Sequence, residues 1–319
     1  MKLNLLLVFT FLSSICSNAS YIDDSFSTIK PDSISKWKEK NNLQLIFTQN
    51  SFINWSSGGN NSISGIVKVH STRNYKNEHL VWNNELKSSY GLNKEEKREL
   101  RKTEDKLEIT STFGYRRNPQ SNWYNSAKFN FSTQFANGYK YPNKDKPISK
   151  LFAPAYMFLG VGSEFFSKKL DLKLYLSPIT NKTTFVFSQP LANEGAFGVE
   201  RALYNDAGEL IKEGKNTRME FGNLVTCEWE KKVMSNIDME NKLTLYSDYL
   251  NNYGNVDVNW ELNFDLTINK YVTANIGTHL RYDHDIKTKE DINNDGILET
   301  TGPKVQLKQL LGVGFSYNF

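Results

Sequence analysis

Two stretches near the C-terminus carry charged and polar residues at alternate positions, a spacing that lets them act together. In the first stretch these residues are Asp257, Asn259, Glu261 and Asp265, and in the second they are His279, Arg281 and Asp283. Alternate residues of a β-strand point to the same face of a sheet. Each set would therefore line one side of a strand, and the two strands follow each other in the chain.

The register between these two strands determines what their side chains can do. A tight turn at 268–272 sets Glu261 opposite His279. Arg281 then lies opposite Asn259 and diagonal to Glu261. Opposite charges that face each other inside a narrow passage form a constriction or a ligand site of a channel. The alternative is a ladder of charges that fills a narrow barrel and stabilises it.

A second candidate site follows in the loop 286–302. Its oxygen ligands would come from Asp291, Asn293, Asp295, the carbonyl of Ile297, and Glu299. Oxygen ligands at alternate positions, with glycine at the sixth, match the first half of an EF-hand-type calcium loop. Because Gly302 replaces the bidentate glutamate at the twelfth position, the pattern predicts only weak calcium binding. Plain loop polarity is the alternative explanation.

The sequence does not indicate catalysis. The four histidines, at positions 70, 79, 279 and 284, are scattered, and none stands beside a serine in a catalytic pattern. No glycine-rich phosphate loop and no Cys/His metal-ligand spacing is present. We therefore expect a protein that is not an enzyme and that needs no cofactor.

The elements that would position the charged residues are β-strands. Period-two alternation predicts twelve of them, at 43–55, 62–75, 79–90, 105–116, 123–138, 151–166, 168–178, 217–233, 238–251, 255–269, 271–285 and 304–319. An even number of antiparallel strands is typical of a transmembrane up-and-down β-barrel. Fourteen strands is the alternative, because 183–188 could add a strand inside the longest loop.

The last strand is the clearest sign of this architecture. From Val305 onward the odd positions are mostly apolar, and the chain ends on Tyr317, Asn318 and Phe319. A C-terminal aromatic residue on an alternating strand is typical of the closing strand of an outer-membrane barrel. We expect Tyr317 and Phe319 to serve as the signal that the barrel-assembly machinery recognises.

The N-terminus and the loops agree with this fold. Lys2 precedes an apolar stretch that ends in small residues, which predicts a signal peptide at 1–19. A periplasmic leader would follow at 20–42, and the barrel would occupy 43–319. The predicted links alternate between short and long along most of the chain, as they do between the periplasmic turns and external loops of such barrels.

Composition limits the remaining classes of protein. Mean hydropathy is −0.55, and the chain after the signal peptide has no apolar run long enough for a membrane helix. Aromatic residues make up 13% of the sequence, which suits the interfacial girdles of a membrane barrel. The net charge of +4 is small, and no basic patch interleaved with aromatic residues indicates nucleic-acid binding.

Several segments together resemble a known family. They are QNSFINWSSGGNNSISG (49–65), KTEDKLEITSTFGY (102–115), FSTQFANGYKYP (131–142), APAYMFLGVG (153–162), LSP (176–178), GAFGV (195–199) and VNWE (258–261). These segments resemble a Gram-negative outer-membrane family known as domain of unknown function 3078. The resemblance implies a barrel in the outer membrane, and it brings no established activity or functional residues.

We therefore expect an outer-membrane β-barrel of a Gram-negative bacterium that acts as a small-solute pore or ligand-binding channel. A non-transporting structural, assembly or surface-display barrel is the alternative. The expected partners are outer-membrane lipids, the barrel-assembly machinery and small polar solutes.

Overall fold

The computed structural model describes residues 36–51, 60–251, 253–290 and 299–319. The expected signal peptide and residues 20–35 of the expected leader lie outside this part of the chain. So do four of the calcium candidates, Asp291, Asn293, Asp295 and Ile297, together with the side chain of Glu299.

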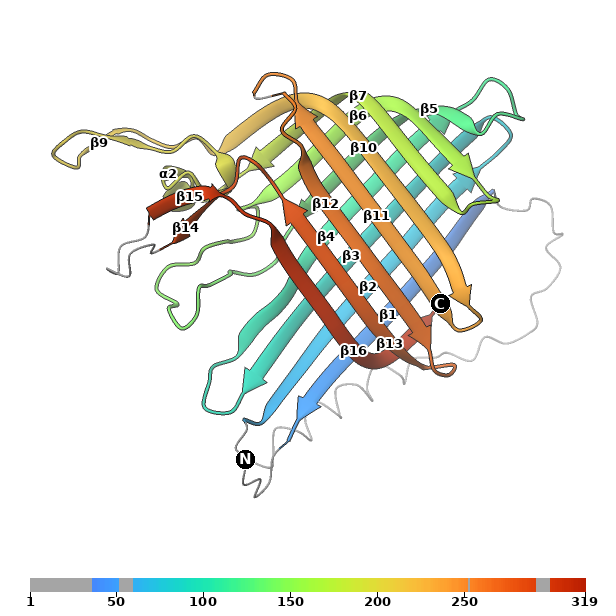
Figure 1. Ribbon diagram of the computed structural model, residues 1–319, viewed down its shortest axis with the longest axis horizontal. Coiled ribbons are helices and arrows are strands. Elements are labelled where there is room, and N and C mark those ends of the chain that lie inside the picture. Colours follow the sequence, from blue (N-terminus) through green and yellow to red (C-terminus); the bar gives the residue numbers. More distant parts are fainter. Residues whose placement is uncertain (1–35, 52–59, 252, 291–298) are drawn as a thin grey trace, which may run out of the picture. The chain divides into compact units, whose positions relative to one another are not determined.

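Twelve antiparallel strands in the described residues close into a barrel, as the sequence predicts (Figure 1). They are β1 (Trp37–Asn50), β2 (Ser62–Lys76), β3 (Leu80–Glu95), β4 (Arg101–Tyr115), β5 (Trp123–Thr133), β6 (Ala155–Ser167), β7 (Leu172–Phe185), β10 (Thr217–Met234), β11 (Ile237–Asp248), β12 (Asp257–Thr267), β13 (Val272–Tyr282) and β16 (Gln306–Asn318). Each strand pairs with the barrel strands that precede and follow it in the chain, and β1 pairs with β16 to close the ring.

The two ends of the barrel differ in their connections. At one end the links are short, at 77–79, 116–122, 168–171, 235–236 and 268–271, and we call this the short-turn end. At the opposite end the links include 134–154, 186–216 and 283–305, and we call this the long-loop end. The extra elements belong to these long loops: α2 (Gln189–Asn193), η2 (Ala196–Gly198), the hairpin β8 (Leu203–Tyr204)–β9 (Leu210–Lys212), and the hairpin β14 (Lys287–Glu290)–β15 (Glu299–Pro303) (Figure 1).

The longest loop has a small apolar core of its own. Val186, Leu191, Ala192 and Val199 pack with Ala153 from the neighbouring long loop. At its surface, Glu200 accepts hydrogen bonds from Lys212 at 2.8 Å and from Lys215, and these bonds lower the pKa of Glu200 to about 2. No helix in the described residues is long and apolar enough to cross a membrane.

Two boundaries differ from the predicted ones. β1 begins at Trp37, so the expected leader end at residue 42 is wrong. The Trp37 ring packs on Tyr75 and Trp82, with centroids 5.3 and 5.6 Å apart, and these contacts extend the strand beyond the alternating pattern.

The second difference concerns β7, which continues through Pro178 to Phe185. The first half of the segment 183–188, which could have added a strand, is therefore the end of β7. A register shift accommodates the proline, which has no backbone N–H to donate. Ser177 donates its hydroxyl to the carbonyl of Val161 at 2.9 Å at this point.

The outer face of the barrel is apolar. The odd positions from Leu307 to Phe319, along β16 and just beyond it, are all exposed and, apart from Gln309, apolar; Leu311 and Phe319 are about 70% exposed. The two predicted assembly residues, Tyr317 and Phe319, stack on this face with ring centroids 5.8 Å apart. Phe264 of β12 lies in register with Ile276, which pairs in turn with Leu311 on the same face. The polar residues between them therefore point into the lumen.

Candidate functional site

The predicted register of β12 and β13 is correct. Glu261 pairs with His279, and Asn259 pairs with Arg281. His279 Nε2 lies 2.6 Å from Asn259 Oδ1 and 3.8 Å from the carboxylate of Glu261. Because an amide oxygen only accepts hydrogen bonds, the proton of this contact belongs to the histidine.

Arg281 does not contact Glu261, the residue that the strand register places diagonally opposite it. Its guanidinium lies over the ring of Tyr156, 4.7 Å from the centroid, and its nearest carboxylate is Asp283 at 4.0 Å. No ion pair joins Arg281 to Glu261 among the described residues, so the structure separates the two charges expected at one constriction. Tyr156 comes from β6, a strand too distant in the sequence for the turn register to reveal it.

Two predicted residues lie at different heights in the lumen. Asp257, at the long-loop end of β12, pairs with Lys182 of β7 at 2.7 Å. Asp265 lies near the short-turn end and accepts a hydrogen bond from Asn275. Asp265 therefore lies apart from the other predicted residues, which extend from the middle of the lumen toward the long-loop end.

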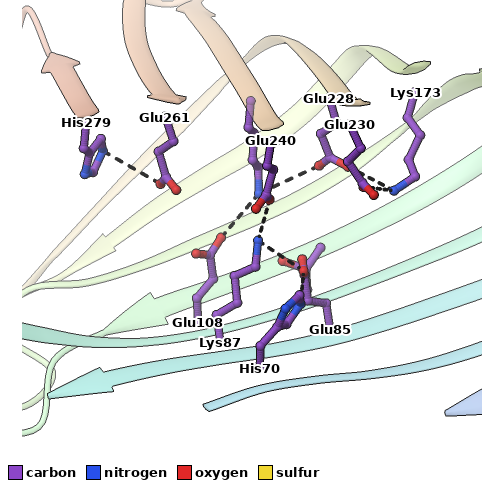
Figure 2. Close-up of polar contacts among 12 residues, drawn as sticks. His70, Glu85, Lys87, Glu108, Lys173, Glu228, Glu230, Glu240, Glu261 and His279 are labelled. Carbon is purple, nitrogen blue, oxygen red and sulfur yellow. Dashed lines mark hydrogen bonds and ion pairs between the residues drawn. The ribbon is translucent and has the colours of Figure 1, made fainter. Parts of the chain in front are cut away.

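Ion pairs join opposite walls of the barrel at mid-height. Lys87 of β3 reaches Glu240 of β11, with Nζ and Oε1 2.9 Å apart (Figure 2). Lys106 of β4 reaches Glu261 of β12 at 3.2 Å. In the closed ring β3 stands opposite β11, and β4 stands opposite β12. These contacts therefore cross the lumen.

Further charges complete this level of the lumen. We call the set Lys87, Lys106, Glu108, Glu228, Glu240, Lys242 and Glu261 the ion-pair layer. Lys106 contacts Glu108 at 2.6 Å, and Lys242 lies 3.7 Å from Glu108 and 3.8 Å from Glu228. Charges removed from bulk water are tolerated when they are paired in this way.

The layer continues toward the walls on both sides. Glu85 joins Lys87 at 3.2 Å and His70 at 2.7 Å, and Lys173 joins Glu228 and Glu230 (Figure 2). The turn-register argument misses even the local pair Glu228–Lys242, because an irregularity between Lys232 and Met234 shifts the register after the link 235–236. It could not find contacts across the lumen, which depend on closure of the whole ring.

A cavity of about 190 Å³ lies on the long-loop side of the ion-pair layer. Its floor includes Lys106, Glu108, Lys242 and Glu261 of the layer, and its walls carry Tyr156, Phe158, Leu224 and Tyr246. Six of the seven predicted residues line it: Asp257, Asn259, Glu261, His279, Arg281 and Asp283. Asp265 does not.

A second charged cluster lies above the cavity, at the long-loop end. We call Lys182, Arg218, Glu220, Asp257, Asp283 and Asp285 the rim cluster. Lys182 is 5% exposed and lies within 3.6 Å of three carboxylates, those of Glu220, Asp257 and Asp283. Arg218 joins Asp285 at 2.5 Å and donates to the carbonyl of Gly198 at 3.2 Å, which connects the cluster to η2.

The side chains that the structure describes include no group of three or more histidine, cysteine, aspartate or glutamate residues arranged to hold a metal ion. The calcium hypothesis for Asp291–Glu299 concerns side chains outside that part and stays a prediction.

A closed antiparallel barrel with an apolar exterior and a charged interior has the architecture of a transmembrane β-barrel. Residues 47–139 match the family model described as "Protein of unknown function (DUF3078)". This match confirms the family resemblance inferred from the sequence motifs, over that segment of the chain. No curated protein matches the chain.

Among solved structures, the chain is similar to several barrels at low sequence identity. The translocator domain of the autotransporter NalP from Neisseria meningitidis has a TM-score of 0.34 and 9% identity, covering 98% of this chain and 95% of that one. The COG4313 outer membrane channel from Pseudomonas putida F1 has a TM-score of 0.38 and 8% identity, with coverages of 94% and 100%. The NanC porin has a TM-score of 0.35 and 10% identity, with coverages of 86% and 98%.

Replacing Lys242 by methionine tests whether the ion-pair layer stabilises the barrel. The lysine is 13% exposed and is a cation close to both Glu108 and Glu228, so its loss leaves an uncompensated negative charge in a poorly hydrated place. Breaking a buried pair at one partner costs about 3–5 kcal/mol. We expect the free energy of unfolding, measured by urea titration in lipid vesicles, to fall by about this amount.

The matched control is Lys38→Met, because Lys38 is exposed at the short-turn end of β1. An exposed substitution changes the free energy of unfolding by about 0.5 kcal/mol or less. Equal effects of the two substitutions would mean that the layer contributes nothing to stability.

Proposed function

We propose that this protein is an outer-membrane, ligand-binding channel that is held closed by the ion-pair layer and binds a small solute in the cavity beside it. The observation that carries the proposal is the pair of contacts across the lumen, Lys87–Glu240 and Lys106–Glu261. The long-loop end faces the outside of the cell, because external loops are the longer ones in such barrels. The cavity then lies on the external side of the layer.

The outer surface supports a position in the membrane. Exposed aromatic residues gather near both ends of the barrel, with Trp82, Trp123 and Tyr271 at the short-turn end and Phe152, Phe187 and Tyr249 at the long-loop end. Amphipathic rings at two levels match the two interfaces of a bilayer. Lipids would contact the apolar band between them, and Phe319 would be available to the assembly machinery before the barrel closes.

The closed lumen distinguishes a ligand-binding channel from an open pore. Eight strands enclose an interior that side chains just fill, so twelve strands leave more room than side chains need. Here long charged side chains extend from opposite walls and meet, with 2.9 Å between Lys87 Nζ and Glu240 Oε1. When the charges of such a layer separate, water can solvate them. An ion-pair layer can therefore open to admit water, whereas an apolar plug cannot be solvated in this way.

A surface-display role is the second candidate. The apolar core of the longest loop, formed by Val186, Leu191, Ala192 and Val199 with Ala153, favours it. Such a core gives the loop a fixed shape, which a partner outside the cell could recognise. Transport is unnecessary for this role, so conductance separates the two candidates.

Arginine substitutions on neighbouring positions of β12 test the membrane location. Leu262 is central in the strand and faces outward, whereas Asn263 faces the lumen. Arginine on the lipid face near the bilayer midplane costs about 2–4 kcal/mol. We expect Leu262→Arg to lower the free energy of unfolding in vesicles by that amount and Asn263→Arg to lower it less. Equal tolerance at both positions would show that the sheet does not lie in a bilayer.

Conductance in planar bilayers tests the closed channel. We expect the wild-type barrel to give no steady current. A variant with Lys87, Glu240, Lys106 and Glu261 all replaced by glutamine loses these two contacts without leaving an unpaired member of either pair. This variant should conduct steadily. The matched control is Glu200→Gln with Lys212→Gln, which removes an exposed pair in the external loop and should stay silent.

Two results would contradict the proposal. A large steady current through wild-type protein would show an open pore. A silent quadruple variant that still migrates as a folded barrel on an unboiled denaturing gel would favour the surface-display role.

A further inference from the structure

We infer that the cavity is built for a small organic anion that carries a ring, with Arg281, Lys128 and Lys242 facing its negative group. This inference rests on the proposed ligand-binding function and specifies its ligand. It follows from a difference in how closely the acidic and the basic side chains of the cavity wall are paired, together with the aromatic side chains beside them.

The acids of the cavity wall are already satisfied. Glu108 and Glu261 share Lys106, at 2.6 and 3.2 Å. Asp257 and Asp283 share Lys182, at 2.7 and 3.5 Å. Glu108, Glu261 and Asp257 thus each lie within 3.2 Å of an ammonium group, and Asp283 lies within 3.5 Å, so the acids have closer counter-charges than the cations described next.

Three cations of the same wall are less closely paired. Lys128 lies 3.7 Å from Glu228, Lys242 lies 3.7 Å from Glu108, and Arg281 lies 4.0 Å from Asp283. These separations exceed the range of a charge-assisted hydrogen bond, which is about 2.7–2.9 Å. The donors of these three side chains are therefore available to an anion that enters the cavity.

The total charge of the residues that line the cavity also favours an anionic ligand. The lining residues include the cations Lys106, Lys128, Lys182, Lys242 and Arg281, and the anions Glu108, Asp257, Glu261 and Asp283. With neutral His279, the wall has one positive charge more than it has negative charges. Glu220 and Glu228 lie beside Lys182, Lys128 and Lys242 but do not line the cavity, so the positive surplus belongs to the surface that a ligand would touch.

Aromatic side chains supply a place for a ring. Tyr156, Phe158 and Tyr246 line the cavity, and Phe158 meets Tyr246 edge to face with centroids 5.9 Å apart. Stacking on Tyr156 holds the Arg281 guanidinium in position, so the cation is fixed before a ligand arrives.

Three probes of similar size and different charge test the inference: benzoate, benzamide and benzylamine. Their binding to the barrel in lipid nanodiscs is measured by equilibrium dialysis against empty nanodiscs, which corrects for partition into lipid. We expect benzoate to bind at least about tenfold more tightly than benzamide, because a charge-assisted hydrogen bond contributes about 1.5–3 kcal/mol. Benzylamine should not bind above the level of empty nanodiscs.

Variants assign the binding to this cavity. Arg281→Gln should weaken benzoate binding about tenfold, and Arg281→Lys, which keeps the charge, should weaken it less. The control is Lys68→Gln, because Lys68 lies on the lumen face between outward Val67 and Val69 but does not line the cavity. Each variant is first checked for the mobility of a folded barrel on an unboiled gel.

The outcomes separate the ligand class from the channel itself. Equal binding of benzamide, preference for benzylamine, or benzoate binding that Arg281→Gln leaves unchanged would overturn the anion assignment while leaving a solute-binding barrel. Failure of folded wild-type protein to bind any of the three probes would overturn the anion assignment and the proposed ligand-binding cavity together.

Discussion

The contacts between lysine and glutamate side chains on opposite walls are the interactions on which the rest of the structure depends. A twelve-stranded barrel has a wide interior, and its polar lumen face must either hold water or satisfy its own charges. Lys87–Glu240 and Lys106–Glu261 satisfy charge across the whole width of the lumen. They divide it into two halves, and the cavity occupies the half near the long loops. The floor of that cavity therefore includes Lys106 and Glu261, which pair across the lumen.

Much of this arrangement could be predicted from the sequence, because it depends on local rules. Alternation located the twelve strands, and one tight turn fixed Glu261 opposite His279. The same rules could not show that Lys106 would be the nearest cation to Glu261. Their strands, β4 and β12, face each other across the lumen only when the ring closes. The start of β1 was also missed. Trp37 is held by Tyr75 and Trp82, and such a ring contact leaves no period-two pattern in the sequence.

The two charged levels of the lumen differ in what surrounds them. The ion-pair layer is held by strands alone, whereas the rim cluster is joined to an external loop through Arg218 and the carbonyl of Gly198. The cavity lies between them, and Lys182 and Asp257 belong both to its wall and to the rim. A ligand that enters from outside would therefore pass groups fixed by a loop before it reaches groups fixed by the barrel. This order gives the external loops a direct physical connection to the cavity.

Thiol accessibility tests most directly whether the ion-pair layer closes the lumen. In a Cys227→Ser background, Asn259→Cys would lie on the cavity side of Glu261, and Asp265→Cys would lie on the short-turn side. Intact cells are treated with a charged maleimide that does not cross the membrane, and permeabilised cells confirm that both thiols can react. The account predicts that only the thiol at 259 is modified in intact cells. Modification at 265 at the same rate would show that solutes pass the layer freely and would contradict the account.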